Sequence, residues 1–548
     1  MLVAEAVGQA LARRGPAHVF GLIGSGNFAV SNALVEEGAQ FVAARHECGA
    51  VAMADAYAQV TGGVGMCSVH QGPGLTNTLT ALTEAAKSRT PLLLLAGDTA
   101  ASALRSNFRI EQDQLVQSVG AIAERIHGPQ TAVADALRAL RRARVERRPV
   151  ALMLPLDIQA AECPASDAVA TEPPSLPPTR PSSEAVSATV DALAGAERPL
   201  IIAGRGAREA HAGSLLEELA ERLGGLLATS AVGNGLFADN PWALGISGGF
   251  ASPTAAELIG QADVVLAAGA TLNMWTTRHA RLLHPRARVI QVDHDPDAIA
   301  AHHRVDIAVI GDVAESARCI LADLPVRPAS PGWRSPEVAE QIRRGTWQSV
   351  PFDDASTETC VDPRTLSNAL DQLLPLDRTV AIDSGHFMGY PAMHLRVPDD
   401  RAFVFTQSFQ SVGLGLGSGI GAAVARPDRV TVTALGDGGA FLSLSDFETV
   451  ARLGLRMLIV IYNDSAYGAE VHHFGPHGDP LDLVQFPDTD FAAIGRAVGL
   501  RGATVRSVKD LDVVTEWLQS GASPGLVLDA KVVPTVVAEW LEEAFRGH

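Results

Sequence analysis

Residues 430–467 constrain the fold of this chain more than any other stretch. A short apolar run at 430–435 ends in Gly-Asp-Gly-Gly, an amphipathic segment follows, and a second apolar run at 457–462 ends in Asn-Asp. This order predicts a strand, a tight turn, a helix and a second strand of a parallel sheet. Asp437 and Asp464 would then lie just past the carboxyl ends of two strands, which is where open α/β sheets bind their ligands.

The glycines beside Asp437 indicate what kind of ligand would bind there. Gly438 and Gly439 let the backbone come close to an anion, and the amide groups that open the helix would point toward it. A carboxylate suits an anion site only when a cation separates the two. Asp437 and an oxygen donor after the next strand would therefore hold Mg2+ on a diphosphate. The alternative for this short motif alone is a glycine-rich turn that carries two solvated acids.

The rest of the chain repeats the alternation of helices and strands. At 548 residues the chain is longer than one hydrophobic core usually supports, so several domains are expected. The alternation predicts the α/β class, with three doubly wound parallel-sheet domains at 1–164, 184–330 and 361–533. Proline-rich stretches at 171–183 and 324–336 are predicted to be linkers. The first and third domains share their layout, as if one had been duplicated.

The Gly-Asp-Gly motif, the helix, the apolar strand and the Asn-Asp pair resemble the signature of the thiamine diphosphate (ThDP) family of acetohydroxyacid synthase, pyruvate decarboxylase and benzoylformate decarboxylase. The resemblance covers nearly the whole chain and implies a pyrimidine-binding, a middle and a diphosphate-binding domain, in that order. It implies that Asp437, the side chain at position 464 and the carbonyl of Ala466 bind the metal. Position 464 is Asp where the family usually has Asn, and Asn463 precedes it, so either Asp464 or Asn463 could be the ligand.

The same resemblance assigns the residues that would hold the cofactor. They are Gln410, Val412, His386, Gly436, Gly438 and Gly439. Val412 would lie beneath the cofactor and bend it, although Val is smaller than the Leu, Ile or Met that is usual there. The carbonyl of Gln410 would accept a hydrogen bond from the cofactor's amino group, and His386 would contact the diphosphate.

Glu47 lies in the sequence Arg-His-Glu-Cys, at the end of an expected strand and the start of an expected helix. By resemblance to the family's Arg-His-Glu motif, Glu47 would hold a proton at the pyrimidine ring, so that the cofactor's own amino group can remove the C2 proton. Taken alone, an acid in the first turn of a helix is explained by the helix dipole. The order Glu47, Gly-Pro-Gly and Gly-Asp-Gly along the chain favours the catalytic role.

Three polar residues are expected around the reacting carbon. Ser25 follows the first strand and His70 the third, and both match positions where benzoylformate decarboxylase has its catalytic Ser and His. Glu470, six residues after Asp464, matches the catalytic Glu of pyruvate decarboxylase. A neutral His and a partly buried Glu can exchange protons with the substrate. This set of residues matches none of the related enzymes completely. The sequence lacks an evident counterpart of the paired His of pyruvate decarboxylase. It also lacks evident counterparts of the Arg and Trp that bind the second 2-oxoacid in acetohydroxyacid synthase.

These features predict a ThDP- and Mg2+-dependent enzyme, a transferase or a lyase, that acts on a 2-oxoacid donor. Similarity along the chain favours an acetolactate-synthase-like carboligase that joins the donor to an aldehyde or a second 2-oxoacid. His70 and Glu470 favour a simple decarboxylase instead. The residues also leave open a C–C lyase and a ThDP-fold partner subunit without activity. The resemblance implies a homodimer or a dimer of dimers, because each site takes its pyrimidine and diphosphate halves from different subunits.

The middle domain is the least determined part of the prediction. Its turn at 204–208, Gly-Arg-Gly-Ala-Arg, is weakly similar to a dinucleotide loop but lacks the third glycine of the fingerprint. Related enzymes hold FAD in this domain or nothing at all, and the sequence leaves both open.

Composition argues against several classes of partner. The formal net charge of −18 argues against nucleic acid and against an anionic membrane. No apolar run reaches transmembrane length, and the N-terminal segment has the pattern of an amphipathic helix and not of a signal peptide. The five scattered cysteines show no metal-ligand spacing and suit a reducing compartment, so we expect the protein in the cytoplasm.

Overall fold

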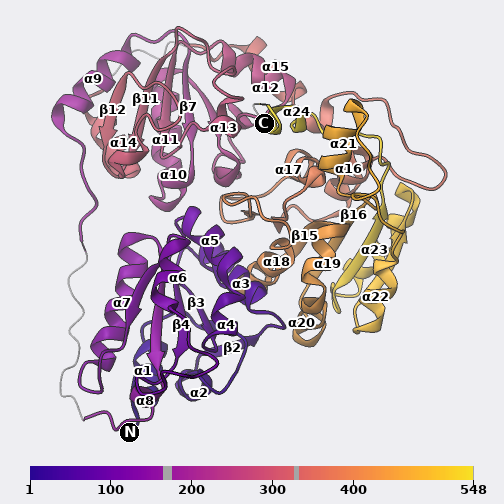
Figure 1. Cartoon of the computed structure of the whole chain (residues 1–548). Coiled ribbons are helices and arrows are strands. Elements are labelled where there is room, and N and C mark those ends of the chain that lie inside the picture. Colours follow the sequence, from indigo (N-terminus) through magenta and orange to yellow (C-terminus); the bar gives the residue numbers. More distant parts are fainter. Residues whose placement is uncertain (165–175, 326–331, 547–548) are drawn as a thin grey trace.

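The computed structural model describes residues 1–164, 176–325 and 332–546. They form three sheets of six parallel strands each, which confirms the expected α/β class. In Figure 1 the three sheet domains lie at the corners of a triangle. Parts of both proline-rich stretches, at 165–175 and 326–331, lie outside the described residues. No helix in the described ranges is long and apolar enough to cross a membrane.

The first sheet has the strand order β2-β1-β3-β4-β6-β5. Its strands are β1 (His18–Gly21), β2 (Gln40–Ala43), β3 (Gly65–Val69), β4 (Leu92–Asp98), β5 (Ile122–Arg125) and β6 (Pro149–Pro155). Its helices are α1 (Val3–Ala12), α2 (Phe28–Glu36), α3 (Glu47–Thr61), α4 (Pro73–Thr76), α5 (Leu79–Lys87), α6 (Gln112–Ser118), α7 (Ala132–Glu146) and α8 (Leu156–Gln159). β3, β4 and β6 are buried along their whole length, as expected for central strands with helices on both faces. The turn expected at 71–77 is instead the single-turn helix α4, since a proline fits the first turn of a helix.

The second sheet has a different order, β12-β11-β10-β7-β8-β9. Its strands are β7 (Pro199–Ala203), β8 (Leu226–Thr229), β9 (Ala243–Ile246), β10 (Val264–Ala268), β11 (Arg288–Asp293) and β12 (Ile307–Ile310). Its helices are α9 (Ser183–Ala194), α10 (Arg205–Glu209), α11 (Gly213–Leu223), α12 (Pro253–Gly260), α13 (Met274–Thr277), α14 (Val313–Asp323) and α15 (Pro336–Arg344). The Ser182 hydroxyl accepts a hydrogen bond from the Ala185 amide at 3.2 Å. Ser182, at the end of the first proline-rich stretch, is therefore the N-cap of α9.

The third sheet has the order β14-β13-β15-β16-β18-β17, which repeats the pattern of the first sheet strand for strand. Its strands are β13 (Arg378–Ile382), β14 (Phe403–Phe405), β15 (Val430–Gly436), β16 (Met457–Asn463), β17 (Arg501–Val505) and β18 (Leu526–Lys531). Its helices are α16 (Pro363–Leu373), α17 (Gly389–His394), α18 (Gly415–Ala425), α19 (Asp437–Ser443), α20 (Phe447–Leu453), α21 (Gly468–Phe474), α22 (Phe491–Ala497), α23 (Asp512–Gln519) and α24 (Leu541–Ala544).

The first and third domains pack against each other through α3 and α18. A Cβ atom at Gly421 would lie 2.1 Å from the carbonyl oxygen of Met53, and one at Gly417 would lie 2.9 Å from that of Gly49. The glycines of α18 therefore let the two helix backbones come into contact. One hydrophobic core cluster includes buried side chains from both domains, so these two domains share a core within one chain.

Candidate active site

A cavity of about 490 Å3 lies at the carboxyl ends of β13, β15 and β16. It brings together every candidate site residue that was predicted in the third domain. They are His386, Gln410, Val412, Gly436, Asp437, Gly438, Gly439, Asp464, Ala466 and Glu470. The volume lies within the range of roughly 300–1,000 Å3 that is typical of small-molecule and cofactor sites.

Asp437 and Asp464 are two carboxylates that line this cavity. Burial raises the pKa of Asp437 to about 6. Burial and the nearby charge of Asp437 raise the pKa of Asp464 to about 7. The raised pKa values mean that ionising both acids together costs free energy. A divalent cation held between them would stabilise both as anions. The donor set therefore fits Mg2+.

Asn463 and Asp464 have different surroundings. The Asn463 side chain is buried and donates to Asp529 at 2.9 Å and to the carbonyl of Thr489 at 3.2 Å. Its oxygen accepts from the amide of Ser465 at 3.1 Å, and Asn463 does not line the cavity. Ser465 has a φ of +57°, and this left-handed turn separates Asp464 from Ala466, both of which line the cavity.

The loop that carries Gln410 and Val412 has a constrained backbone. Gln410 has a φ of +63° and Gly413 has a φ of +95°. The buried carboxylate of Asp383, at the end of β13, accepts hydrogen bonds from the amides of Gly413 at 2.9 Å and Leu414 at 3.1 Å. Left-handed backbone at a residue other than glycine persists only where its surroundings hold it, and such positions cluster at functional sites.

The side-chain amide of Gln407 shows that this cavity suits a polar ligand. Its Nε2 is buried and has no hydrogen-bond partner among the described residues, while its oxygen accepts from the Ser384 hydroxyl at 3.2 Å. A buried donor without an acceptor is costly, and a ligand or ordered water in the cavity can satisfy it. The cavity, its two acids and this donor fit the diphosphate half of ThDP with Mg2+.

His386 is neutral and tied to the C-terminal segment. Its Nε2 accepts a hydrogen bond from the amide of Ala538 at 2.9 Å, which leaves the proton on Nδ1. Burial and the nearby His472 lower the pKa of His386 to about 3. His472, His473 and His477, which match no tetrahedral metal pattern in the sequence, lie on α21 and just beyond it. No group of three or more His, Cys, Asp or Glu in the described ranges is arranged to hold a metal ion.

The outer wall of the cavity comes from segments that were not predicted to contribute to the site. Met274 and Trp275 of α13 contribute from the middle domain, and the C-terminal segment contributes Trp540, Leu541, Ala544 and Phe545. The two indole rings lie 6.1 Å apart between centroids. Tryptophan is scarce in this chain, which was the only signal in the sequence for this wall. Among the described lining residues there is no Lys or Arg.

The candidates in the first domain form a separate group. Glu47 is buried at the first position of α3, and the side-chain amide of Asn77 donates to one of its oxygens at 3.0 Å. Gly74 lies between Glu47 and His70, because a Cβ there would lie 3.6 Å from the Glu47 carboxylate and 3.1 Å from the His70 Cβ. Asn77 was not predicted as a site residue, although it follows the Gly-Pro-Gly turn by only a few positions.

His70 and Ser25 lie on the loops after β3 and β1. The His70 ring packs on the Phe108 ring at 5.0 Å between centroids, and its Nδ1 has no partner among the described residues. Ser25 is exposed. Neither they nor Glu47 line the cavity of Asp437, so the two groups of candidate residues lie apart within one chain.

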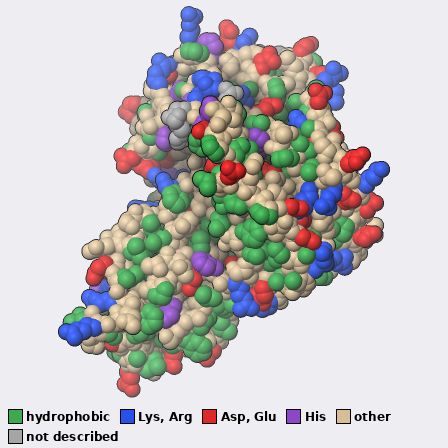
Figure 2. Space-filling view, turned by 45° about the vertical axis from the view of Figure 1, so that its right-hand side comes forward, with side chains coloured by type: hydrophobic (Ala, Val, Ile, Leu, Met, Phe, Trp, Pro, Cys, Tyr) green, Lys and Arg blue, Asp and Glu red, His purple; other side chains and the backbone are tan. Residues whose placement is uncertain are grey.

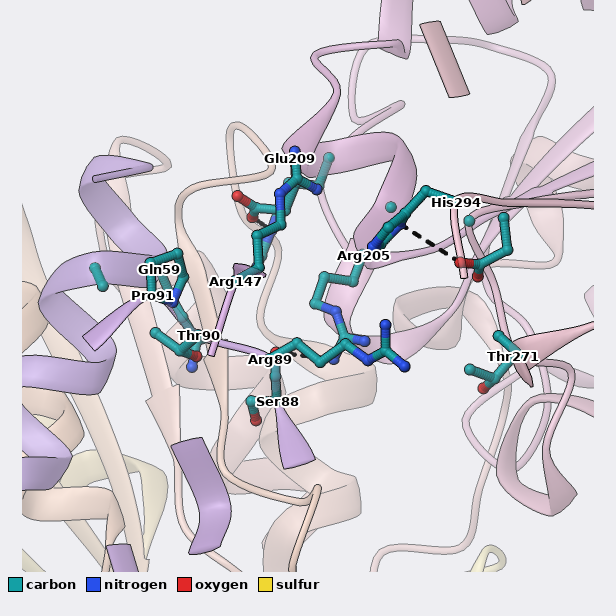
Figure 3. Close-up of a pocket in the computed structure, with 16 residues that line it drawn as sticks. Gln59, Ser88, Arg89, Thr90, Pro91, Arg147, Arg205, Glu209, Thr271 and His294 are labelled. Carbon is teal, nitrogen blue, oxygen red and sulfur yellow. Dashed lines mark hydrogen bonds and ion pairs between the residues drawn. The ribbon is translucent and has the colours of Figure 1, made fainter. Parts of the chain in front are cut away.

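The Gly-Arg-Gly-Ala-Arg turn begins α10 and borders a smaller cavity between the first and middle domains (Figure 3). This cavity measures about 70 Å3. Arg205 points across it and donates to the Ser88 carbonyl at 2.9 Å, and Arg89 forms an ion pair with Asp295. These contacts join the two domains. The space is well below the roughly 300 Å3 at which small-molecule sites begin, so this cavity as it stands has no room for FAD.

Three family models match the chain in the order of the three sheets. The N-terminal TPP binding domain of thiamine pyrophosphate enzymes matches residues 1–120, the central domain matches 186–320, and the C-terminal TPP binding domain matches 383–528.

Curated relatives are similar over almost the whole chain. A Pseudomonas aeruginosa protein named "Probable 2-ketoarginine decarboxylase" is 30% identical over 531 residues, covering 94% of this chain and 91% of the relative. The acetolactate synthase large subunit of Parasynechococcus marenigrum is 29% identical, with 92% and 83% covered. The pyruvate oxidase of Lactiplantibacillus plantarum is 27% identical, with 97% and 89% covered.

Proposed function

This chain belongs to the thiamine pyrophosphate enzyme family, and on that basis we propose that it is a Mg2+-dependent decarboxylase of a 2-oxoacid. The overall reaction converts R–CO–COOH into R–CHO and CO2. The observation that carries this proposal is the lining of the third-domain cavity, where two acids lie close enough for the charge of one to raise the pKa of the other, and where no Lys or Arg is present among the described residues. The acids suit a metal-bound diphosphate. The half of the site that this domain supplies offers no cationic side chain to the carboxylate of a second 2-oxoacid as acceptor.

In this proposal, residues of the third domain hold the cofactor. Asp437, Asp464 and the carbonyl of Ala466 hold Mg2+, and Gly436, Gly438 and Gly439 border the diphosphate. Asp464 is favoured over Asn463 as ligand, because Asp464 lines the cavity and Asn463 does not, and because the Asn463 side-chain oxygen, the atom that would bind a metal, accepts from the Ser465 amide at 3.1 Å. His386 presents a neutral ring with its proton on Nδ1, and adds no charge beside the diphosphate.

The loop at 407–413 shapes the reacting end. The Gln410 carbonyl would accept a hydrogen bond from the aminopyrimidine, and Val412 would lie beneath the cofactor. When bound, ThDP supplies a carbon nucleophile for the substrate carbonyl and accepts the electron pair that CO2 leaves behind.

The first domain supplies proton control. Glu47 holds a proton at the pyrimidine ring, and Asn77 fixes one of its carboxylate oxygens so that the other is free to do so. His70, whose Nδ1 lacks a protein partner among the described residues, and Glu470 exchange protons with the substrate oxygen and carbon. Ser25 orients the substrate carboxylate.

We infer that two chains complete each site, as a homodimer or a dimer of dimers. The half-site of Glu47 and that of Asp437 do not meet in one chain, and exposed apolar side chains surround both. Figure 2 shows hydrophobic side chains gathered in the centre of one face, with charged side chains mostly toward its edges. Exposed apolar side chains include Phe28 and Phe108 in the first domain, and Phe441, Leu442 and Tyr467 in the third. The five cysteines are unpaired, which supports the cytoplasm as the compartment to test.

A carboligase is the second candidate, because the acetolactate synthase large subunit is similar over 92% of this chain. Decarboxylase and carboligase differ in the fate of the fragment left after CO2 loss, which is either protonated or joined to an acceptor. A C–C lyase and an inactive partner subunit are the third and fourth candidates.

Product analysis by mass spectrometry distinguishes these four candidates. The protein with ThDP and Mg2+ is incubated with 2-oxoacids bearing methyl, aliphatic, aromatic and guanidino side chains, with and without an added aldehyde. We expect aldehyde and CO2 as the main products, and no product from Glu47→Gln, with the exposed Glu36→Gln as matched control. Acyloin as the main product would support the carboligase. Absence of both turnover and C2 proton exchange in the wild type would support an inactive subunit.

A further inference from the structure

Glu84 is a buried acid whose hydrogen bonds cross from the first domain to the cofactor loop of the third. It lies on α5 and is only 1% exposed. One of its oxygens accepts from the amide of Ser408 at 3.0 Å, and the other accepts from the amide of Phe409 at 2.6 Å. The Ser88 hydroxyl lies within hydrogen-bonding distance of both Glu84, at 3.1 Å, and the Ser408 hydroxyl, at 2.8 Å. Every one of these contacts is made within a single chain.

The loop is thereby held at both ends by buried carboxylates. Glu84 holds its beginning at Ser408 and Phe409, and Asp383 holds its end at Gly413 and Leu414. Gln410 and Val412, the two residues expected to bend the cofactor, lie between these anchors. The left-handed backbone of Gln410 needs such support, because this conformation costs free energy for a residue other than glycine.

The hydrogen bonds from the loop amides to the Glu84 carboxylate are charge-assisted. Charge-assisted hydrogen bonds between a carboxylate and backbone amides are shorter and stronger than neutral ones. Burial raises the pKa of Glu84, and its hydrogen bonds with the loop amides oppose this effect. If the loop moved away, the buried carboxylate would lose its two donors. If the carboxylate were replaced, at least one loop amide would lose its acceptor.

We propose that Glu84 is a positioning residue, which sets the place of the Gln410 carbonyl and of Val412 and so couples the first domain to the cofactor loop of the same chain. The proposal rests on the proposed function for the place of the cofactor, but the contact itself does not. Glu84 touches neither substrate nor cofactor in this scheme. It acts through the loop backbone.

Glu84→Gln tests the proposal with two measurements: hydrogen exchange in the loop, and the affinity for ThDP compared with that for pyrophosphate. A general loss of stability would lower both affinities together, whereas loss of the loop position would lower only the affinity for ThDP. A carboxamide can accept from one loop amide but presents its own NH2 to the other. Hydrogen exchange on the full-length protein should become at least tenfold faster in the peptide that contains Ser408 and Phe409. Affinity for ThDP with Mg2+ should fall at least tenfold, while affinity for inorganic pyrophosphate with Mg2+ stays within twofold, because pyrophosphate occupies only the diphosphate half.

Asp135→Asn is the matched control. Asp135 is also buried in the first domain, but its hydrogen bonds with His127, Thr131 and Arg138 stay on α7 and the segment just before it. It should change neither loop exchange nor the ratio of the two affinities. Ser88→Ala is the milder second variant in case Glu84→Gln does not fold, and should shift the same quantities in the same direction by roughly twofold to fivefold.

The outcomes distinguish a positioning role of Glu84 from a general structural role. Unchanged exchange at Ser408 and Phe409 would overturn the proposal, as would a parallel loss of ThDP and pyrophosphate affinity. If the wild type binds no ThDP, the proposed function fails. The exchange experiment would then still report whether Glu84 holds the loop.

Discussion

Replacing Asp464 with Asn tests whether burial and the nearby charge of Asp437 destabilise the ionised Asp464. Burial and the charge of Asp437 raise the pKa of Asp464 to about 7, from 3.8 for a free Asp. An acid whose pKa is raised on folding destabilises the folded state only at pH values where it is ionised in the unfolded chain. The cost is nearly absent at pH 4, grows as the pH rises toward 7 and is complete above it.

The size of the effect follows from the two pKa values. A rise from 3.8 to about 7 corresponds to roughly 4 kcal/mol. Asp464 borders an open cavity, so solvent screening reduces this figure to about 2 kcal/mol. A domain of roughly 150–250 residues changes its Tm by about 2–4 °C per kcal/mol. Asp464→Asn should therefore raise the Tm of the cofactor-free protein by about 4–8 °C at pH 8, and by less than half as much at pH 5.

The assay is differential scanning calorimetry of the cofactor-free protein in EDTA at several pH values between 5 and 8. Asp479→Asn removes the same charge from an exposed position and serves as the control. Mg2+ and ThDP should stabilise the wild type strongly, because the metal neutralises the pair. A Tm difference that does not depend on pH, or a less stable Asp464→Asn at pH 8, would refute the reasoning.

Three further substitutions test the assigned roles. Asp437→Ala should abolish retention of ThDP through gel filtration, because one of the two charged metal ligands is lost; full retention would defeat the metal assignment. Glu47→Gln should remove the spectroscopic signal of the imino tautomer of bound ThDP without preventing binding, and a persistent signal would exclude Glu47 from proton control. His70→Ala should slow turnover at least tenfold, about 1.4 kcal/mol, and unchanged kinetics would remove His70 from the mechanism.

The class of fold and the place of Asp437 and Asp464 could be predicted from local sequence, whereas Gln410, Val412 and His386 were assigned by the family resemblance. Apolar runs of strand length, broken by glycines and followed by amphipathic segments, specify parallel strands and helices because each depends on neighbouring residues only. The acids of 430–467 follow strands, and parallel strands end at one edge of a sheet. Asp437 and Asp464 were therefore bound to lie near each other.

Other features depended on residues distant in the chain. The turn expected at 71–77 became the helix α4, and the sequence could not choose between Asn463 and Asp464 as the side chain that lines the cavity. Asn463 faces inward because Asp529 on β18, the neighbouring strand, accepts its hydrogen bond. No local pattern contains that partner.

By itself, the sequence determined three parallel-sheet domains and a loop chemistry suited to a metal-bound diphosphate, since periodicity and turn residues act over a few positions. Only the tertiary structure decided that the C-terminal segment and Trp275 wall the cavity, that Arg205 occupies the cavity between the first and middle domains, and that Glu84 holds the loop of Gln410. These contacts join residues that are more than a hundred positions apart in the chain. Their geometry exists only after the domains have packed, because α3 and α18 must first bring the first and third domains together.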